Sequence, residues 1–115
     1  MLVDSNRYFV LDEDRNVVPF EGTILEWAER HEKSEDRIVK QQKVCGFWIS
    51  TVFLSLDHGY FPDRPPVVFE TMVFRGKESD LWCQRSCTYE EALRTHEEAV
   101  KEFSSVVGWL RGMKL

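Results

Sequence analysis

FWISTVFLSL, residues 47–56, is the stretch that decides the fold. It is rich in β-branched and aromatic side chains, which favour the pleated backbone of a strand. A second run of the same kind, VVFETMVF at residues 67–74, follows after a ten-residue loop. One short connection between two strand-forming runs favours antiparallel neighbours. The sequence therefore predicts an antiparallel pair at the centre of the fold.

Weaker strand signals lie on both sides of this pair. Residues 7–11 are typical of a first strand, which the polar turn 12–16 ends. Residues 17–20 are extended, and Pro19 bars them from a central position in a sheet. Residues 37–43 fit an edge strand, and a last strand is expected near 81–85. About four to five strands therefore form an antiparallel sheet.

Two helices complete the expected fold. One covers about residues 23–33, where apolar positions recur at steps of three and four. The other begins at a capping box formed by Thr88 and Glu91. These elements predict an α+β fold, with one domain over residues 1–115 and the sheet packed on both helices as a two-layer sandwich. The apolar stripe of the second helix comprises Ala92, Leu93, His96, Ala99, Val100, Phe103 and Val107.

Composition narrows the class of protein. The 115 residues are 43% apolar and 30% charged, which suits a single soluble domain with a full core. The net charge of −5 is spread along the chain and argues against nucleic-acid binding, which needs a basic stripe. No apolar run is long enough for a membrane span, and the first residues lack the pattern of an export signal, so we expect neither an anchor nor export. Three cysteines without framework spacing favour reduced thiols, so we expect a cytoplasmic protein.

Asp57 and His58, at the exit of the 47–56 run, are the first candidates for chemistry. An Asp beside a His can hold the imidazole in one tautomer, and a neutral His can act as a base or metal ligand. Adjacent strand residues point to opposite faces, however. The competing interpretation is that Asp57 braces the loop by accepting from backbone N–H groups while His58 packs against it.

Glu70 and His96 are two further catalytic candidates. Glu70 lies mid-strand among apolar neighbours, and three explanations stay open: a functional acid, a structural partner of another side chain, or part of an exposed binding face. His96 faces the sheet, where a histidine is more often a bonded core residue than a catalyst. Convergence of His58, Glu70 and His96 would permit hydrolysis or metal binding. Their spacing does not support this, so we expect neither a metal nor a cofactor.

The cysteines carry one weaker possibility. Cys83 and Cys87 are too far apart for a Cys-x-x-Cys motif, which disfavours a structural zinc. Cys87 precedes the second helix, whose dipole would lower the pKa of its thiol. No base lies within reach in the sequence, so we do not expect a nucleophile there.

The loop that joins the two central strands is the strongest candidate for binding. Tyr60 and Phe61 are large apolar groups at a loop tip, Pro62 stiffens them, and Asp63 with Arg64 supplies a polar edge. Such a loop is either an interaction anchor or a local plug over the end of the sheet. Both interpretations remain open.

Several motifs together resemble a known family. They are the Ser50–His58 strand ending in Leu-Asp-His, the Pro65-Pro66 pair, the Phe69–Phe74 strand with Phe-Glu-Thr-Met, and the helix that opens at Thr88 and bears His96. This pattern is similar to that of a family of small uncharacterised proteins from bacterial and phage genomes. The resemblance implies a fold and a genomic setting but no reaction.

The resulting functional expectation is a protein-binding module. The resemblance implies a phage or prophage accessory protein, which by association suggests an inhibitor of a host or defence factor. A small hydrolase or metal-dependent enzyme using His58, Glu70 and His96 is the alternative, although the sequence leans against an enzyme. A homodimer packed sheet on sheet or edge on edge, without a ligand, is the third possibility.

Overall fold

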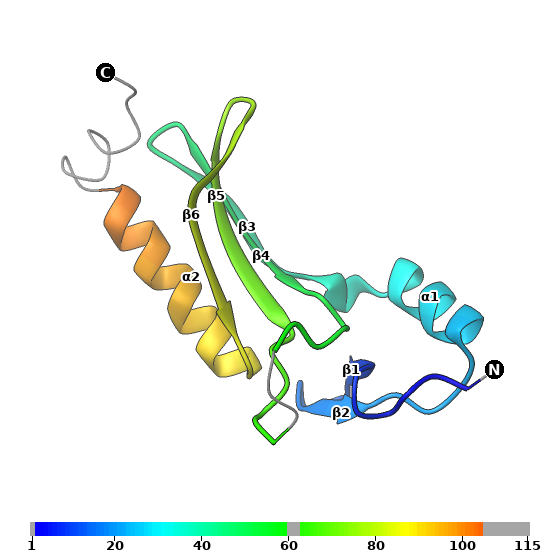
Figure 1. The fold of residues 1–115 in the computed structure, drawn as a ribbon. Helices are drawn as coiled ribbons and strands as arrows, with labels where there is room; N and C mark the ends of the chain where they lie inside the picture. Colours follow the sequence, from blue (N-terminus) through cyan, green and yellow to red (C-terminus); the bar gives the residue numbers. More distant parts are fainter. Residues whose placement is uncertain (1, 60–62, 105–115) are drawn as a thin grey trace.

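The computed structural model describes residues 2–59 and 63–104, with the backbone alone at residues 78–80 (Figure 1). Its main body is a four-stranded antiparallel sheet in the order β3-β4-β5-β6. The strands are β3 (Ile38–Val44), β4 (Phe47–Phe53), β5 (Phe69–Arg75) and β6 (Glu78–Ser86). The predicted central pair is confirmed, because β4 and β5 are antiparallel neighbours and Thr51 lies opposite Thr71.

Tight turns join the outer strands to this pair. Cys45 and Gly46 both have positive φ, 50° and 86°, between β3 and β4. Two such residues form the hairpin turn whose twist matches that of the strands. Gly76, with φ of 59°, lies in the corresponding turn between β5 and β6. Because that turn is so short, β6 begins at Glu78 rather than near residue 81 as expected.

The long α2 (Tyr89–Phe103) covers one face of the sheet (Figure 1). Thr88 is its N-cap, as predicted, and the Glu91 N–H donates to the Thr88 hydroxyl at 3.1 Å. Alternate residues of β4 and β5 face this helix and form two apolar clusters beneath it. Val107, which the sequence adds to the helical stripe, lies outside the described residues. Core residues on this interface include Phe47, Ile49, Phe69, Val73, Ala92, Ala99 and Phe103.

The N-terminal strands form a separate small sheet. β1 (Phe9–Leu11) pairs antiparallel with β2 (Val17–Pro19). Ser55 joins this sheet to the end of β4, since the Phe9 N–H donates to the Ser55 carbonyl at 2.8 Å. The Ser55 hydroxyl in turn donates to the Phe9 carbonyl. Ser55 has a φ of 65°, which explains why β4 ends at Phe53 rather than at the expected residue 56.

The first helix differs most from expectation. α1 (Ile24–Lys33) has a complete capping box between Thr23 and Glu26, followed by the short 3₁₀ turn η1 (Glu35–Arg37). It buries none of its residues, however, and Figure 1 shows it at the end of the molecule away from α2. The prediction of two helices packed on one sheet therefore holds for α2 and is wrong for α1. None of the described helices has the length and apolar character that a membrane crossing requires.

Candidate functional site

His96 lies completely buried between α2 and the sheet. Its Nε2 is 2.7 Å from Gln42 Oε1 on β3, and its Nδ1 is 2.8 Å from Thr51 Oγ1 on β4. Thr51 Oγ1 lies a further 2.7 Å from Thr71 Oγ1 on β5. Because an amide oxygen only accepts, Nε2 carries the proton and Nδ1 accepts from Thr51. A single directed chain of hydrogen bonds therefore links three strands to the helix.

The surroundings of His96 favour its neutral form. Burial lowers the pKa of the imidazole, and the nearby Lys40 ammonium lowers it further, while the Glu97 carboxylate partly opposes this. Lys40 and Glu97 form an ion pair at 2.8 Å beside the buried chain. Both ring nitrogens of His96 are already engaged by protein groups. The geometry thus matches the bonded core histidine that the sequence favoured.

The candidate catalytic residues do not converge. Glu70 lies next to Thr71 on β5, so its side chain points to the sheet face opposite the one that holds His96. There it accepts from Arg85 Nε at 3.0 Å. His58 is exposed at the start of the 57–66 loop. Within residues 2–59 and 63–104, no three His, Cys, Asp or Glu side chains are grouped closely enough to hold a metal ion.

Asp57 acts as a structural brace for its loop. Its Oδ1 accepts from the Gly59 N–H and from the Val67 N–H, each at 2.8 Å. The second bond closes the loop across ten residues, and the His58 N–H donates to the Val67 carbonyl at 2.9 Å beside it. The Asp57 carboxylate therefore braces the loop by accepting from backbone N–H groups, as the structural interpretation of the Asp57-His58 pair predicted.

The environment of Cys87 reverses the direction expected for its thiol. The residue is half-buried, and its Sγ lies 3.8 Å from the Pro65 carbonyl oxygen. Burial raises the pKa of the Cys87 thiol, and the carboxylates of Glu91 and Asp57 raise it further. The shift is opposite to the lowered thiol pKa that the sequence argument expected from the helix dipole.

Only part of the proposed binding loop lies in the described structure. Asp63 and Arg64 are exposed, which suits a polar edge. Tyr60, Phe61 and Pro62 lie outside the described residues, so the choice between anchor and plug stays a prediction.

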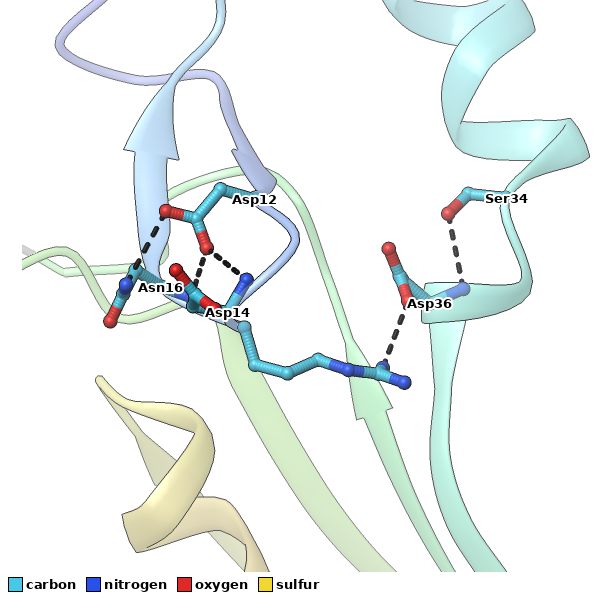
Figure 2. Close-up of polar contacts among 6 residues, drawn as sticks. Asp12, Asp14, Asn16, Ser34 and Asp36 are labelled. Carbon is cyan, nitrogen blue, oxygen red and sulfur yellow. Dashed lines mark hydrogen bonds and ion pairs between the residues drawn. The ribbon is translucent and has the colours of Figure 1, made fainter.

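A cleft of about 570 Å³ separates the β1–β2 turn from the start of α2. Arg15, in this turn, reaches across to Asp36 of η1 with an N–O distance of 2.9 Å (Figure 2). Its guanidinium also lies 5.2 Å from the centre of the Tyr89 ring. The turn itself is held by the Asp12 carboxylate, which accepts from the Asp14 and Asn16 N–H groups (Figure 2). The Arg15 guanidinium therefore links the β1–β2 turn to η1 and to the start of α2.

The sheet face opposite α2 carries partly exposed apolar side chains. Trp48 is 43% exposed, and Phe74 lies directly opposite it on β5. A shallow depression of about 680 Å³ surrounds them, with Ser50, Gln41 and Lys43 in its lining. In the described structure, the covering helix α2 lies on the other face (Figure 1). Glu70 lies on this face but is paired with Arg85, which fits the second explanation of Glu70, a structural partner of another side chain.

The outer face of α1 is the second accessible apolar surface. Trp27 and His31 point inward, where their rings stack with centroids 5.5 Å apart and Trp27 packs edge-on against Tyr8. Leu25 points away from them and is 78% exposed. The N-terminal Leu2, 75% exposed, pairs with Thr23 beside the start of the helix. We call the outer residues Leu25, Ala28, Glu29 and Glu32, together with the flanking Ile24, the α1 outer face.

Sequence reasoning missed this surface. Leu25 was available as a signal, because it lies outside the apolar stripe that the sequence predicts from Ile24, Trp27, Ala28 and His31. Of that stripe, Trp27 and His31 are half-buried, and Ile24 and Ala28 are exposed. A large apolar residue on the polar side of a predicted helix suggests a contact beyond the domain.

Comparison with known proteins adds no further constraint. The chain matches no family model, no curated protein and no solved structure.

Proposed function

We propose that this protein is a small protein-binding module and that α1 is its principal contact element. The supporting observation is that α1 buries none of its residues and exposes the neighbouring Ile24 and Leu25. Leu2 is exposed beside them, because it pairs with Thr23 at the start of the helix. Short helices in proteins are normally stabilised by burying an apolar face. Here the capping box and the Trp27 contacts hold the helix, and its large outer side chains remain accessible.

Preorganisation supports the same proposal. The Thr23 hydroxyl accepts from the Glu26 N–H, while the Glu26 carboxylate accepts from the Thr23 N–H at 3.2 Å. These bonds form the first turn before any partner arrives. A helix that is already formed loses less conformational entropy on binding than a disordered segment does.

The Tyr60–Arg64 loop is the second proposed contact. It offers two aromatic anchors stiffened by Pro62, with Asp63 and Arg64 as a polar edge. A Tyr60→Ala/Phe61→Ala double variant tests this contact separately from α1. Loss of partner capture with an unchanged melting temperature supports an anchor, whereas a lowered melting temperature identifies a plug.

The biological setting rests on the family resemblance alone. It favours a cytoplasmic accessory protein of phage or prophage type whose partner is a host or defence factor. The hydrolase alternative is not carried forward, because Glu70 and His96 lie on opposite faces of the sheet. The homodimer alternative keeps one supporting feature, the partly exposed Trp48 opposite Phe74.

Comparative capture from host extract tests the proposed function. The bait is the full chain, and its variants are Leu25→Glu on α1, Trp48→Glu on the open sheet face, and Glu98→Lys on α2 as a surface control. We expect Leu25→Glu to reduce the captured partner about tenfold or more, equivalent to about 1.4 kcal/mol. Equal capture by all three variants would overturn the proposal, and selective loss with Trp48→Glu would move the site to the sheet.

A further inference from the structure

Contrary to the even spread of charge expected from the sequence, acids outnumber bases around α1. Residues 21–36 contain six acids and two bases, and so carry a formal charge of −4 out of the −5 of the whole chain. Two of these acids are paired in the structure, Glu29 with Lys33 and Asp36 with Arg15. The carboxylates of Glu21, Glu32 and Glu35 have no ion-pair partner among the described residues. The acids are Glu21, Glu26, Glu29, Glu32, Glu35 and Asp36, and the bases are Arg30 and Lys33.

Acidic and apolar groups occur on the same side of the helix. Leu25, Ala28 and Glu32 are separated by three and four residues, so they form one row along α1. All three are exposed, and Glu29 adjoins the row. The α1 outer face therefore places Leu25 beside the carboxylates of Glu29 and Glu32.

The second helix provides an internal comparison. α2 also exposes acids, among them Glu90 and Glu98. Its described residues include no exposed large apolar side chain, because its apolar stripe is buried against the sheet. The exposed side chains of α2 are thus the polar groups expected in contact with water, whereas the exposed Leu25 of α1 is not.

We infer that the α1 outer face binds a basic amphipathic helix of a partner protein. This inference rests on the proposed function and adds the chemistry of the partner. Leucines of such a helix would cover Leu25 and Ile24, while its lysines and arginines would lie opposite Glu32 and the neighbouring acids. Helix-on-helix docking uses apolar anchors at three- and four-residue spacing, and on α1 Ala28 lies three residues after Leu25 and four after Ile24. Opposite charges at the rim would set orientation and accelerate association.

Charge also favours a basic helix over the other candidates for binding the α1 outer face. A second copy placed face to face would bring Glu32 and the neighbouring carboxylates against the same groups, which opposes association. An anionic membrane surface would likewise repel the unpaired carboxylates. A basic helix instead neutralises them.

A direct test uses a synthetic leucine–lysine peptide of about 18 residues, long enough for five helical turns. The control peptide has the same composition in an order that gives no apolar face. Amide chemical shifts of the full-length protein report where each peptide binds. We expect saturable shifts centred on Leu25, Ala28 and Glu32 with the amphipathic peptide and not with the control, weakening as salt rises from about 50 to 300 mM.

Three variants of the protein make the test specific. Glu32→Lys adds a cation to the last turn, which the helix dipole tolerates, and should weaken binding about tenfold. Leu25→Glu adds an acid to the first turn, which the dipole also tolerates, and should weaken binding to a similar degree despite the extra negative charge. Glu98→Lys makes the same charge change on α2 and should leave the affinity within about twofold of the wild type.

Several outcomes would overturn the inference. They are equal binding of both peptides, equal weakening by Glu98→Lys and Glu32→Lys, or no binding of the amphipathic peptide. A wild-type dimer in sedimentation that Leu25→Glu dissociates would show that a second copy is the occupant. If the peptide fails while capture from extract still depends on Leu25, the proposed function stands and only the partner chemistry is wrong.

Discussion

The indole N–H of Trp27 donates to the hydroxyl oxygen of Ser55 at 2.8 Å, joining α1 to the chain just beyond the end of β4. Ser55 is buried, has a φ of 65° and also bonds Phe9 of the small sheet. One serine therefore connects the first helix, the N-terminal strands and the central sheet. This connection holds α1 from one side and leaves the α1 outer face accessible.

Replacing Trp27 with Phe should loosen α1 without unfolding the domain. The change removes the bond to Ser55 and part of the ring stacking with His31 and Tyr8. A hydrogen bond of this kind contributes about 1 kcal/mol. Hydrogen exchange should quicken at the amides of α1 while those of β4 and β5 keep their protection. Equal acceleration in both places would show that α1 is part of the cooperative core.

The two N-cap threonines provide a matched comparison. Thr88→Ala should lower the free energy of unfolding of the whole domain by about 1 kcal/mol, because α2 forms one side of the core. Thr23→Ala removes a similar cap from α1, which buries no residue, so it should mainly increase local opening of that helix. Urea denaturation and hydrogen exchange measure the two effects. A global loss with Thr23→Ala as large as with Thr88→Ala would contradict this difference.

His96 should make the domain less stable in mild acid. Its pKa is lowered in the fold by burial and by Lys40, so the folded protein keeps it neutral where the unfolded chain takes up a proton. Below about pH 6.5, the ordinary pKa of a histidine, the unfolded chain therefore binds more protons than the folded protein does. Stability should be full above that pH and decline as pH falls below it. Urea midpoints measured between about pH 7.5 and 5 follow this change.

A His96→Gln variant identifies the source of that pH dependence. It should flatten the decline while costing about 1–3 kcal/mol at neutral pH, because Thr51 and Gln42 lose their bonded partner. His31 acts in the same direction, since burial and Arg37 lower its pKa, and His31→Gln measures its separate share. An unchanged acid decline in the double variant would assign it to other groups.

The central architecture was predictable because local signals and the core agree there. The runs at 47–56 and 67–74 are both strongly strand-forming, and the apolar residues on one face of the pair pack on α2. The Thr88 cap is equally local, since a threonine three residues before a glutamate forms it without help from distant contacts. Such elements are set by residues that are close in the sequence.

Other features depend on contacts between residues that are far apart in the sequence. The period of residues 24–31 predicts an apolar face on α1 but not whether another element covers it. The bonds from His96 to β3 and β4, and from Thr51 on to β5, follow from the pairing register of the sheet, and the left-handed backbone at Ser55 follows from its contacts with the small sheet. The separation of Glu70 from His96 also follows from this register, because neighbouring strand residues face opposite sides.

Site-specific photocrosslinking tests the central claim, that the α1 outer face is the docking surface, most directly. A photoreactive amino acid replaces Leu25 in one protein and Glu98 on α2 in another, and both are exposed to the same host extract. We expect a discrete crosslinked partner from position 25, competed by unlabelled wild-type protein and not by Leu25→Glu, with none from position 98. The same crosslinked products from both positions, or none from position 25 when wild-type protein captures a partner, would contradict the account.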